Sequence, residues 1–363
     1  MIPPCIQPYI MYENESAYKA YYNLASAHIF PIVLVVDNDG KLAGVLTMGE
    51  FLPFGSTRLI NLSDTTTVGE VCNKNYFSLN ESQDIYLQGR NLFAEHNIKI
   101  IPIVSETGEP VRLFARWQAF FREHLEDGKL HYPYYADCIW RAANYAKYKG
   151  YERISVLEFG VAGGRGLIRA ELYAIEIERL VGIKIDVYGF DSGVGLLVSN
   201  EHKDMLWHFS PGEYEMDIEA LLSRLQKAKI VIGDICDTSK TFLSVYQPAP
   251  IGAMFIDVDT YSPTLAALNM LLGDDDYFLP IIAMYFDDVS ADYQFQGEWQ
   301  AVSEFNEKSE FIKISPNDPL LNHNIKWKEG TQWWASKLKQ CYRFNHNRFT
   351  RSDVNKRQLP LPL

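Results

Sequence analysis

The sequence predicts an α/β protein with two domains, a doubly wound sheet preceded by a smaller α+β domain. Three observations support this prediction. The chain has 363 residues, which is long for one domain. Strand and helix patterns alternate from residue 153 onward, whereas the N-terminal part contains one strand–turn–strand pattern twice. We therefore expect domains at residues 1–127 and 128–363, divided at the Asp127-Gly128 breaker.

The composition limits the class of protein. There are 34 Lys and Arg against 46 Asp and Glu, so the formal net charge is -12, and such an acidic field repels nucleic acid and anionic lipid. The five cysteines show no CxxC pairing, which favours reduced thiols. The N-terminus lacks a signal-peptide pattern, and no apolar stretch approaches the roughly 20 residues of a membrane span. We expect a cytoplasmic protein with no membrane span that acts on a small molecule and binds no nucleic acid.

The N-terminal pattern occurs at 20–51 and again at 89–121. Each copy has a helical stretch, an apolar strand, a turn with glycine and a second strand. The segments "PIVLVVDNDGKLAGVLT" and "IPIVSETGEPVRLF" resemble the core of paired cystathionine-β-synthase-type (CBS) modules. The resemblance implies an adenine-nucleotide cleft, in which Thr or Ser and an Asp three residues later grip the ribose, and it implies a homo-oligomer.

The two copies depart from this ribose-binding pattern. The first copy has Thr47 with Glu50, and the second has Ala115 with Gln118. A structural or dimerising role and a regulatory adenylate site therefore both stay open for the N-terminal domain.

The elements of the second domain follow from their periodicity. Apolar runs bounded by Gly, Pro or Asp predict strands at 153–159, 183–190, 229–234, 249–259 and 279–288. Helical spacing of apolar residues predicts helices at 136–148, 167–181, 217–228 and 262–272. A last strand is expected at the sheet edge over 337–344. It leads into a basic tail, expected to be solvated or to contact another subunit, which carries Arg343, Arg348, Arg351, Lys356 and Arg357.

The first strand of this sheet ends in a glycine loop. Four residues of this loop have no side chain, namely Gly160, Gly163, Gly164 and Gly166. Such a loop lets a ligand approach the N-terminus of the next helix. Glu158 would repel a pyrophosphate but suits an ammonium group, Asp191 suits a ribose diol, and Asp234 suits an adenine edge. Together these features favour S-adenosylmethionine over NAD.

Two later strands end in pairs of carboxylates. Asp257 and Asp259 alternate and share one face of the chain, and Asp287 with Asp288 ends the next strand. Strand ends of a parallel sheet meet at one rim, where four unpaired carboxylates raise one another's pKa values. A hard divalent cation relieves this repulsion, so a metal site is predicted. A single strand-end Asp more commonly caps a segment or makes a turn bond.

Residues from about 132 to 346 resemble the class I S-adenosylmethionine-dependent methyltransferases, with their Rossmann-like sheet, and most of all the macrocin O-methyltransferase-like group. The motifs that carry the resemblance are "VLEFGVAGGRG", "YGFDSGVGL", "FIDVDTYSPTLAAL" and "YFDDV". It implies methyl transfer to a hydroxyl of a sugar, glycan or glycoside. It also implies a magnesium ion on Asp257, Asp287 and Asp288, with Asp259 as the general base.

Some assignments stay open. His202 and His208 lie in an aromatic-rich insertion where a substrate cover could sit, and either is an alternative base. Glu298 follows a loop that could reach the same rim. A non-catalytic regulatory protein that senses adenosyl ligands is the alternative function, but it would not need four carboxylates. A nicotinamide oxidoreductase would want a GxGxxG turn, which the chain lacks, and a Tyr-x-x-x-Lys pair, whose spacing occurs at Tyr145 and Lys149 but precedes the cofactor strand.

Overall fold

The computed structural model describes residues 2–25, 29–51, 65–289, 295–316 and 332–349. The chain forms two compact units, Met1–His124 with Leu222–Arg224, and Leu125–Leu221 with Leu225–Leu363. The main division thus falls between His124 and Leu125, whereas the sequence places it between 127 and 128. The five cysteines are free thiols. Within the described ranges, no helix has the length and apolar character that crossing a membrane requires.

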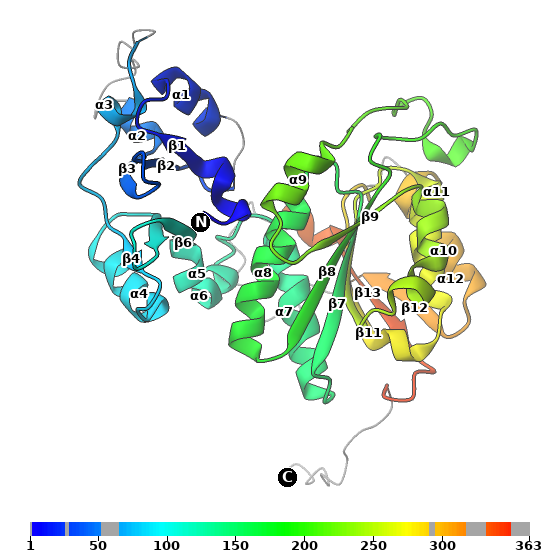
Figure 1. The fold of residues 1–363 in the computed structure, drawn as a ribbon. Coiled ribbons are helices and arrows are strands. Elements are labelled where there is room, and N and C mark those ends of the chain that lie inside the picture. Colours follow the sequence, from blue (N-terminus) through cyan, green and yellow to red (C-terminus); the bar gives the residue numbers. More distant parts are fainter. Residues whose placement is uncertain (1, 26–28, 52–64, 290–294, 317–331, 350–363) are drawn as a thin grey trace, which may run out of the picture. The chain divides into compact units, whose positions relative to one another are not determined.

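The N-terminal unit contains the predicted repeat (Figure 1). Its first sheet has β1 (Ile10–Tyr12), β2 (Val33–Val36) and β3 (Leu42–Leu46), and its second has β4 (Leu79–Asn80), β5 (Ile100–Val104) and β6 (Pro110–Ala115). In each copy the first two strands are parallel and the last two are antiparallel. The glycines of the two hairpin turns, Gly40 and Gly108, both adopt the left-handed conformation, with φ of 80° and 92°. The internal repeat is therefore confirmed.

Short helices flank these strands. They are η1 (Pro4–Tyr9), α1 (Ala17–Ala25), α2 (Met48–Phe51), α3 (Val68–Val71), α4 (Ile85–Glu95), α5 (Arg116–Ala119) and α6 (Phe121–Glu126). Strand β2 is buried along its whole length, because Val33 and Val35 face the core of the first copy while Leu34 faces the opposite way. Leu34 shares its cluster with Leu113 of the second copy. The uninterrupted apolar run of β2 thus serves two cores.

The C-terminal unit is built on a seven-stranded sheet. Its strands are β7 (Arg153–Phe159), β8 (Lys184–Asp191), β9 (Lys229–Ile232), β10 (Ile251–Ile256), β11 (Phe278–Phe286), β12 (Ile312–Pro316) and β13 (Leu338–Arg343). They lie in the order β12-β13-β11-β10-β7-β8-β9. The strands from β11 to β9 are parallel, and β13 is antiparallel to both of its neighbours. The winding direction reverses between β7 and β10, which is where open α/β sheets bind ligands.

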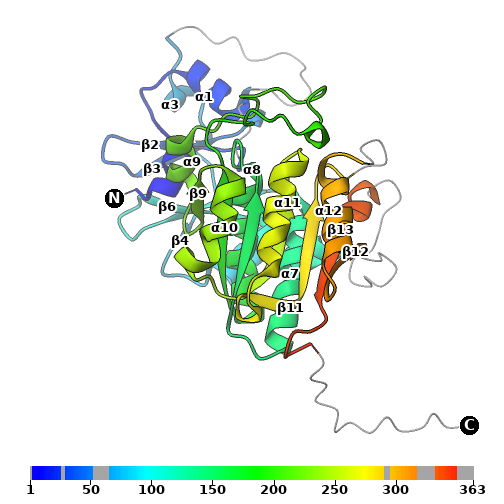
Figure 2. The same ribbon diagram turned by 90° about the vertical axis from the view of Figure 1, so that its right-hand side faces the viewer.

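Helices cover both faces of this sheet, with α7 and α8 on one face and α10, α11 and α12 on the other (Figures 1 and 2). The helices are α7 (Pro133–Tyr148), α8 (Arg165–Val181), α9 (Ile218–Arg224), α10 (Ile235–Tyr246), α11 (Tyr261–Asn269) and α12 (Gly297–Lys308). Single 3-10 turns occur at η2 (His202–Asp204), η3 (Met270–Leu272), η4 (Asp275–Tyr277) and η7 (Gln332–Lys337). These layers confirm the α/β class.

Helix α10 was not expected. Its sequence, ICDTSKTFLSVY, is rich in Ser, Thr and β-branched residues, which have modest helix propensity. Tertiary packing compensates, because the fully buried Phe242 packs edge-on against Tyr188 and Phe190 of β8. Asp234 caps the helix by accepting a hydrogen bond from the backbone N–H of Cys236 at 2.8 Å.

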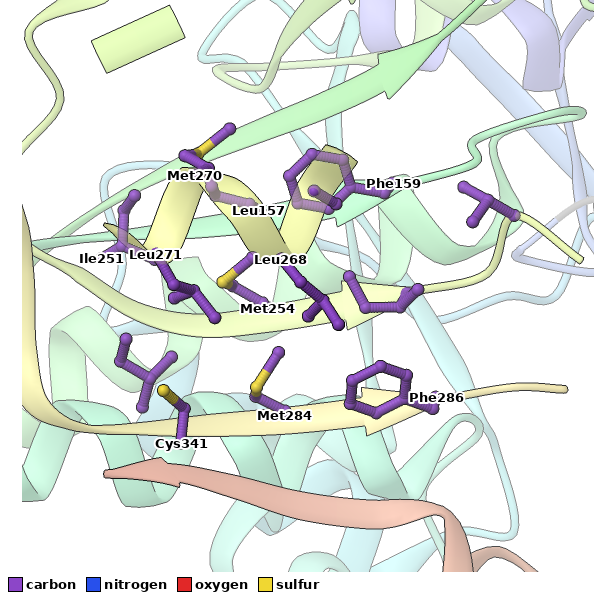
Figure 3. Close-up of a cluster of buried hydrophobic side chains, with 14 of the residues drawn as sticks. Leu157, Phe159, Ile251, Met254, Leu268, Met270, Leu271, Met284, Phe286 and Cys341 are labelled. Carbon is purple, nitrogen blue, oxygen red and sulfur yellow. The ribbon is translucent and has the colours of Figure 1, made fainter. Parts of the chain in front are cut away.

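Four buried residues on four adjacent strands form one row at the carboxyl end of the sheet. The pairing register matches Phe190 to Phe159, Phe159 to Ile256, and Ile256 to Phe286, and all four are fully buried. Figure 3 shows Phe159 and Phe286 with other side chains of this core, among them Leu268 of α11. This packing fixes the position of the residue that follows each of the four at the carboxyl end of the sheet.

The expectation of a final edge strand was wrong. Strand β13 lies inside the sheet, between β11 and β12, and β12 forms the edge. Arg343, expected in the solvated tail, is only 2% exposed. A strand inserted at this position carries its side chains into packed layers, so Arg343 needs internal partners. Arg348 is exposed as expected, while Arg351, Lys356 and Arg357 lie outside the described residues.

The Arg343 guanidinium ties β13 to the chain before β11. It donates hydrogen bonds to the carbonyls of Leu271 and Gly273, and to the Asp275 carboxylate at 2.7 Å. It also lies 4.4 Å from the ring centroid of Phe278. One buried side chain therefore satisfies several acceptors at once.

Arg343→Met should lower the free energy of unfolding by about 3 kcal/mol, because it leaves several acceptors and the Asp275 carboxylate without their donor. The matched control is Arg153→Met, which removes an Arg–Asp pair of similar geometry whose arginine side chain is 60% exposed. That change should cost less than about 1 kcal/mol. Urea denaturation of both variants measures the difference, and equal losses would contradict the role given to Arg343.

Candidate functional site

A cavity of about 710 Å³ lies at the carboxyl ends of the parallel strands of the C-terminal unit. Its walls include residues that follow β7, β8, β9, β10 and β11, together with much of the segment 195–214. The size suits a small-molecule ligand. The predicted site residues that line it are Gly160, Asp191, Asp234, Asp257, Asp259, Asp287, Asp288 and His208.

The residues that follow the buried row lie side by side across the sheet. The backbone hydrogen bonds of the sheet continue one residue beyond this row. The N–H of Gly160 donates to the carbonyl of Phe190, that of Asp257 to the carbonyl of Phe159, and that of Asp287 to the carbonyl of Ile256, each at 2.9 Å. Asp191 is the residue directly after Phe190 in β8. The register of the strands thus brings the predicted glycine loop and the predicted carboxylates together.

Gly160 is required by a close approach of two strand ends. Its φ is 84°, and a Cβ there would lie 1.7 Å from the carbonyl oxygen of Asp257. Gly163 has open space around it, by contrast. A Cβ on Gly166 would lie 1.9 Å from Glu158 Oε1. Gly163, Gly164 and Gly166 are not among the residues that line the cavity.

Asp191 holds the glycine loop in place. Its Oδ2 accepts the backbone N–H groups of Val161 and Ala162, both at 2.9 Å, and its Oδ1 accepts that of Gly193 at 2.7 Å. Each carboxylate oxygen can accept a further hydrogen bond. Asp191 therefore shapes the cavity and keeps acceptor capacity on its wall.

Glu158 lies beneath the loop and outside the cavity lining. It is 2% exposed, and its Oε1 accepts a hydrogen bond from the Tyr135 hydroxyl at 2.7 Å. Burial raises the pKa of Glu158 well above its usual range. Its predicted contact with an ammonium group stays a prediction.

Asp234 has a double position. It caps α10 through Oδ1 and also lines the cavity beside Ile235 and Cys236. A polar rim next to an apolar side chain is the kind of surface that a flat heterocycle fits.

Three carboxylates converge as a possible metal site. Asp257, Asp287 and Asp288 each offer one oxygen, and these oxygens lie within 4.8 Å of one another. Burial raises the pKa of Asp257 well above its usual range, and the carboxylates of Asp287 and Asp288 raise it further. An all-oxygen set of this kind fits a hard divalent cation such as Mg²⁺.

Among the described residues, Asp287 interacts with a hydroxyl group and with a lysine. Its Oδ1 accepts a hydrogen bond from the Tyr285 hydroxyl at 2.6 Å and lies 3.3 Å from Lys337 Nζ. Lys337 also donates to the Asp287 carbonyl. Asp288 Oδ2, in contrast, is buried without a hydrogen-bond partner among the described residues. An oxygen in that state can accept a hydrogen bond or bind a cation.

Asp259 combines backbone strain with a shifted pKa. Its φ of 61° places a non-glycine residue in the left-handed region. Burial and the neighbouring Asp288 carboxylate raise its pKa to about 8. A carboxylate at a cavity wall with a pKa near neutrality is suited to accept a proton.

The insertion after β8, where the sequence indicated that a substrate cover could sit, contributes much of the cavity lining. Its Asp204 accepts hydrogen bonds from the backbone N–H and hydroxyl of Ser262 at 2.6 and 2.8 Å. Its Lys203 forms an ion pair with Glu304 at 2.6 Å. These polar contacts attach the segment to α11 and α12. Some of its apolar side chains are exposed.

The two histidines differ in position. His208 lines the cavity, whereas His202 is 82% exposed in its side chain and lies 2.8 Å from Glu201. Glu298 is fully buried, and its Oε2 accepts the backbone N–H of Asp288 at 2.9 Å. The structure therefore brings His208 and Glu298 to the site and leaves His202 outside the cavity lining.

Three contributors were missed in the sequence. Tyr285 lies two residues before Asp287, and the alternation of a strand could have indicated their shared face. Tyr135 lies on a helix, and Lys337 is 50 residues away from Asp287 along the chain. No local pattern connects these two residues to the site.

The residues that the sequence compared with a ribose-binding pattern act as helix caps, and of the two residues that precede the helices only Thr47 has a side-chain acceptor. Glu50 Oε2 accepts the backbone N–H and the hydroxyl of Thr47 at 2.6 and 2.7 Å. Gln118 Oε1 accepts the backbone N–H of Ala115 at 2.8 Å. In both copies the side chain of the third helical residue thus accepts the backbone N–H of the residue before the helix.

Gly160→Ala should lower the free energy of unfolding by about 2 kcal/mol or more, because it adds left-handed strain and a clash with the Asp257 carbonyl. Gly163→Ala, in the same loop, is the control and should change it by less than about 0.5 kcal/mol. Urea denaturation of the two variants distinguishes them. Similar stabilities would contradict the close approach at Gly160.

The metal-free protein should lose stability as pH rises. The folded state raises the pKa of Asp259 from 3.8 to about 8, so it holds a proton that the unfolded state has released in this range. The free energy of unfolding therefore falls between pH 4 and 8, by up to about 1.4 kcal/mol per pH unit for one such group. Urea denaturation in a chelator measures the slope.

Asp259→Asn should make this slope less steep, because it removes one of the carboxylates with a raised pKa, whereas the exposed Asp237→Asn should leave the slope unchanged. A wild-type stability that is constant or rises over this range would contradict the raised pKa.

The chain is only weakly similar to the known proteins with which it was compared. No protein-family model and no curated protein matches the chain. The calicheamicin methyltransferase CalS11 matches with a TM-score of 0.35 and 19% identity, over 58% of this chain and 77% of CalS11. Staphylococcus aureus OpuCA matches with a TM-score of 0.26 and 15% identity, over 33% of this chain and 92% of OpuCA. CBS domains of a transcriptional regulator from Streptococcus pneumoniae match with a TM-score of 0.27 and 16% identity, over 33% and 93%.

The matching solved structures thus include CBS-domain proteins and a methyltransferase. At these TM-scores the likenesses assign neither a family nor an activity to this chain.

Proposed function

We propose that the C-terminal unit is a metal-dependent O-methyltransferase that uses S-adenosylmethionine and acts on a hydroxyl of a sugar, glycan or glycoside. One observation carries the proposal: a glycine loop held by Asp191 and a cluster of carboxylates open into the same cavity, at the reversal point of a doubly wound sheet. The choice of cofactor and acceptor rests on the sequence motifs named above.

In this proposal, different residues of the cavity wall bind the cofactor and the metal ion. Asp191 and Asp234 would bind the ribose and adenine of the cofactor, and Gly160 would let it approach the sheet. Asp257, Asp287 and Asp288 would hold Mg²⁺. When bound, S-adenosylmethionine supplies an electrophilic methyl group, and Mg²⁺ lowers the pKa of the acceptor hydroxyl.

Asp259 would take the proton of that hydroxyl. Its raised pKa matches a base that works near neutral pH, and its strained backbone places it on the cavity wall. The acceptor oxygen would gain the methyl group as the bond between that methyl and the cofactor's sulfur breaks, S-adenosylhomocysteine would leave, and Asp259 would keep the proton. The segment 195–214 would limit the access of water to the reacting groups.

The test is calorimetric titration of S-adenosylhomocysteine into the full chain, with and without Mg²⁺. Wild-type protein should bind one equivalent, and Asp191→Asn should weaken binding about tenfold or more, since a charge-assisted acceptor is lost. Asp186→Asn is the control, because this residue lies on the same strand and pairs with Arg153 at 2.7 Å. The affinity of the Asp186→Asn variant for S-adenosylhomocysteine should equal that of the wild type.

No binding of S-adenosylhomocysteine at millimolar concentration would refute the methyltransferase proposal. Binding that survives Asp191→Asn unchanged would move the ligand away from this cavity.

A further inference from the structure

Glu298 is a buried carboxylate that the proposed reaction does not use. It lies in the first turn of α12 and is fully buried. Full burial of a glutamate is rare unless the charge is paired. Its Oε2 accepts the backbone N–H of Asp288 at 2.9 Å, while its Oε1 has no hydrogen-bond partner in the described part of the chain.

The surroundings of Glu298 connect it to the carboxylate cluster. Oδ2 of the half-buried Asp288 and Oε1 of the buried Glu298 are both buried oxygens without a hydrogen-bond partner among the described residues. Such atoms require a hydrogen-bond donor or a positive charge. A hydrated divalent cation supplies both kinds of partner.

The start of α12 is fixed tightly against the site. Gly297 has a φ of 55°, and a Cβ on it would lie 2.8 Å from Met205 Cε and 3.4 Å from the carbonyl oxygen of Asp259. Gly297 therefore lies close to Met205 and to the backbone of Asp259, and a side chain at this position would not fit. The first turn of α12 thus lies directly against the end of β11.

We propose that Glu298 is a positioning residue of the metal site, which holds the backbone of Asp288 so that its side chain faces the cation. This inference rests on the proposed function, because it requires that Asp257, Asp287 and Asp288 bind a metal ion. Groups that orient metal ligands typically change metal affinity by about 10- to 100-fold when they are removed.

The test measures Mn²⁺ affinity of the full chain by electron paramagnetic resonance, together with S-adenosylhomocysteine affinity by calorimetry. Glu298→Met keeps the length of the side chain but removes both oxygens, so Mn²⁺ binding should weaken about 100-fold. Glu298→Gln keeps an oxygen that can accept the Asp288 N–H, so the loss should be about tenfold, the lower end of the same range. The exposed Glu307→Ala, on the same helix, should match the wild type.

The outcomes separate the two proposals. S-adenosylhomocysteine should bind all of these variants with wild-type affinity, which also shows that they are folded. If Glu298→Met binds Mn²⁺ as the wild type does, the role of Glu298 is refuted and the metal site stands. If Glu298→Met does not fold, Glu298→Gln decides, and wild-type Mn²⁺ affinity in that variant refutes the role. Absence of Mn²⁺ binding in the wild type overturns both proposals.

Discussion

The register of four parallel strands controls the geometry of the candidate site. Phe190, Phe159, Ile256 and Phe286 pair in one buried row, and the residue after each of them lies at the carboxyl end of its strand. Side chains alternate along a strand, so a slip by one residue in any of these pairs would turn a carboxylate from the cavity into the core. The apolar packing in Figure 3 therefore has a direct consequence for the chemistry at the rim.

The carboxylates at this rim are costly for the folded protein. Burial raises the pKa values of Asp257, Asp259, Asp288 and Glu298, and two of their oxygens lack partners within the described ranges. Each unsatisfied buried polar group costs about 1–3 kcal/mol. The proposed cation would offset this cost. Lys337 and Tyr285 offset the charge of Asp287 without occupying the open oxygens of its neighbours.

Polar anchors rather than apolar burial hold the cover of the cavity. Asp204 and Lys203 connect the segment after β8 to α11 and α12, while Leu206 and Trp207 are 50% and 66% exposed. Exposed apolar side chains near a cavity mouth often contact a ligand. In the N-terminal unit, Glu50 and Gln118 form capping hydrogen bonds at the starts of α2 and α5, and a ligand of this unit and the expected homo-oligomer stay predictions.

The sequence alone determined the elements with strong local signals. The apolar runs predicted the five parallel strands, the repeat predicted two similar sheets in the N-terminal unit, and the strand-end carboxylates predicted the cluster of Asp257, Asp287 and Asp288. These features depend on residues close together in the chain. The position of β13, the burial of Arg343 and the contact of Lys337 with Asp287 were decided by the tertiary structure. The same holds for α10, which forms despite weak propensity, and for Glu158, which lies beneath its loop rather than on the cavity wall. Each of these depends on packing between segments distant in sequence, and no local pattern records such contacts.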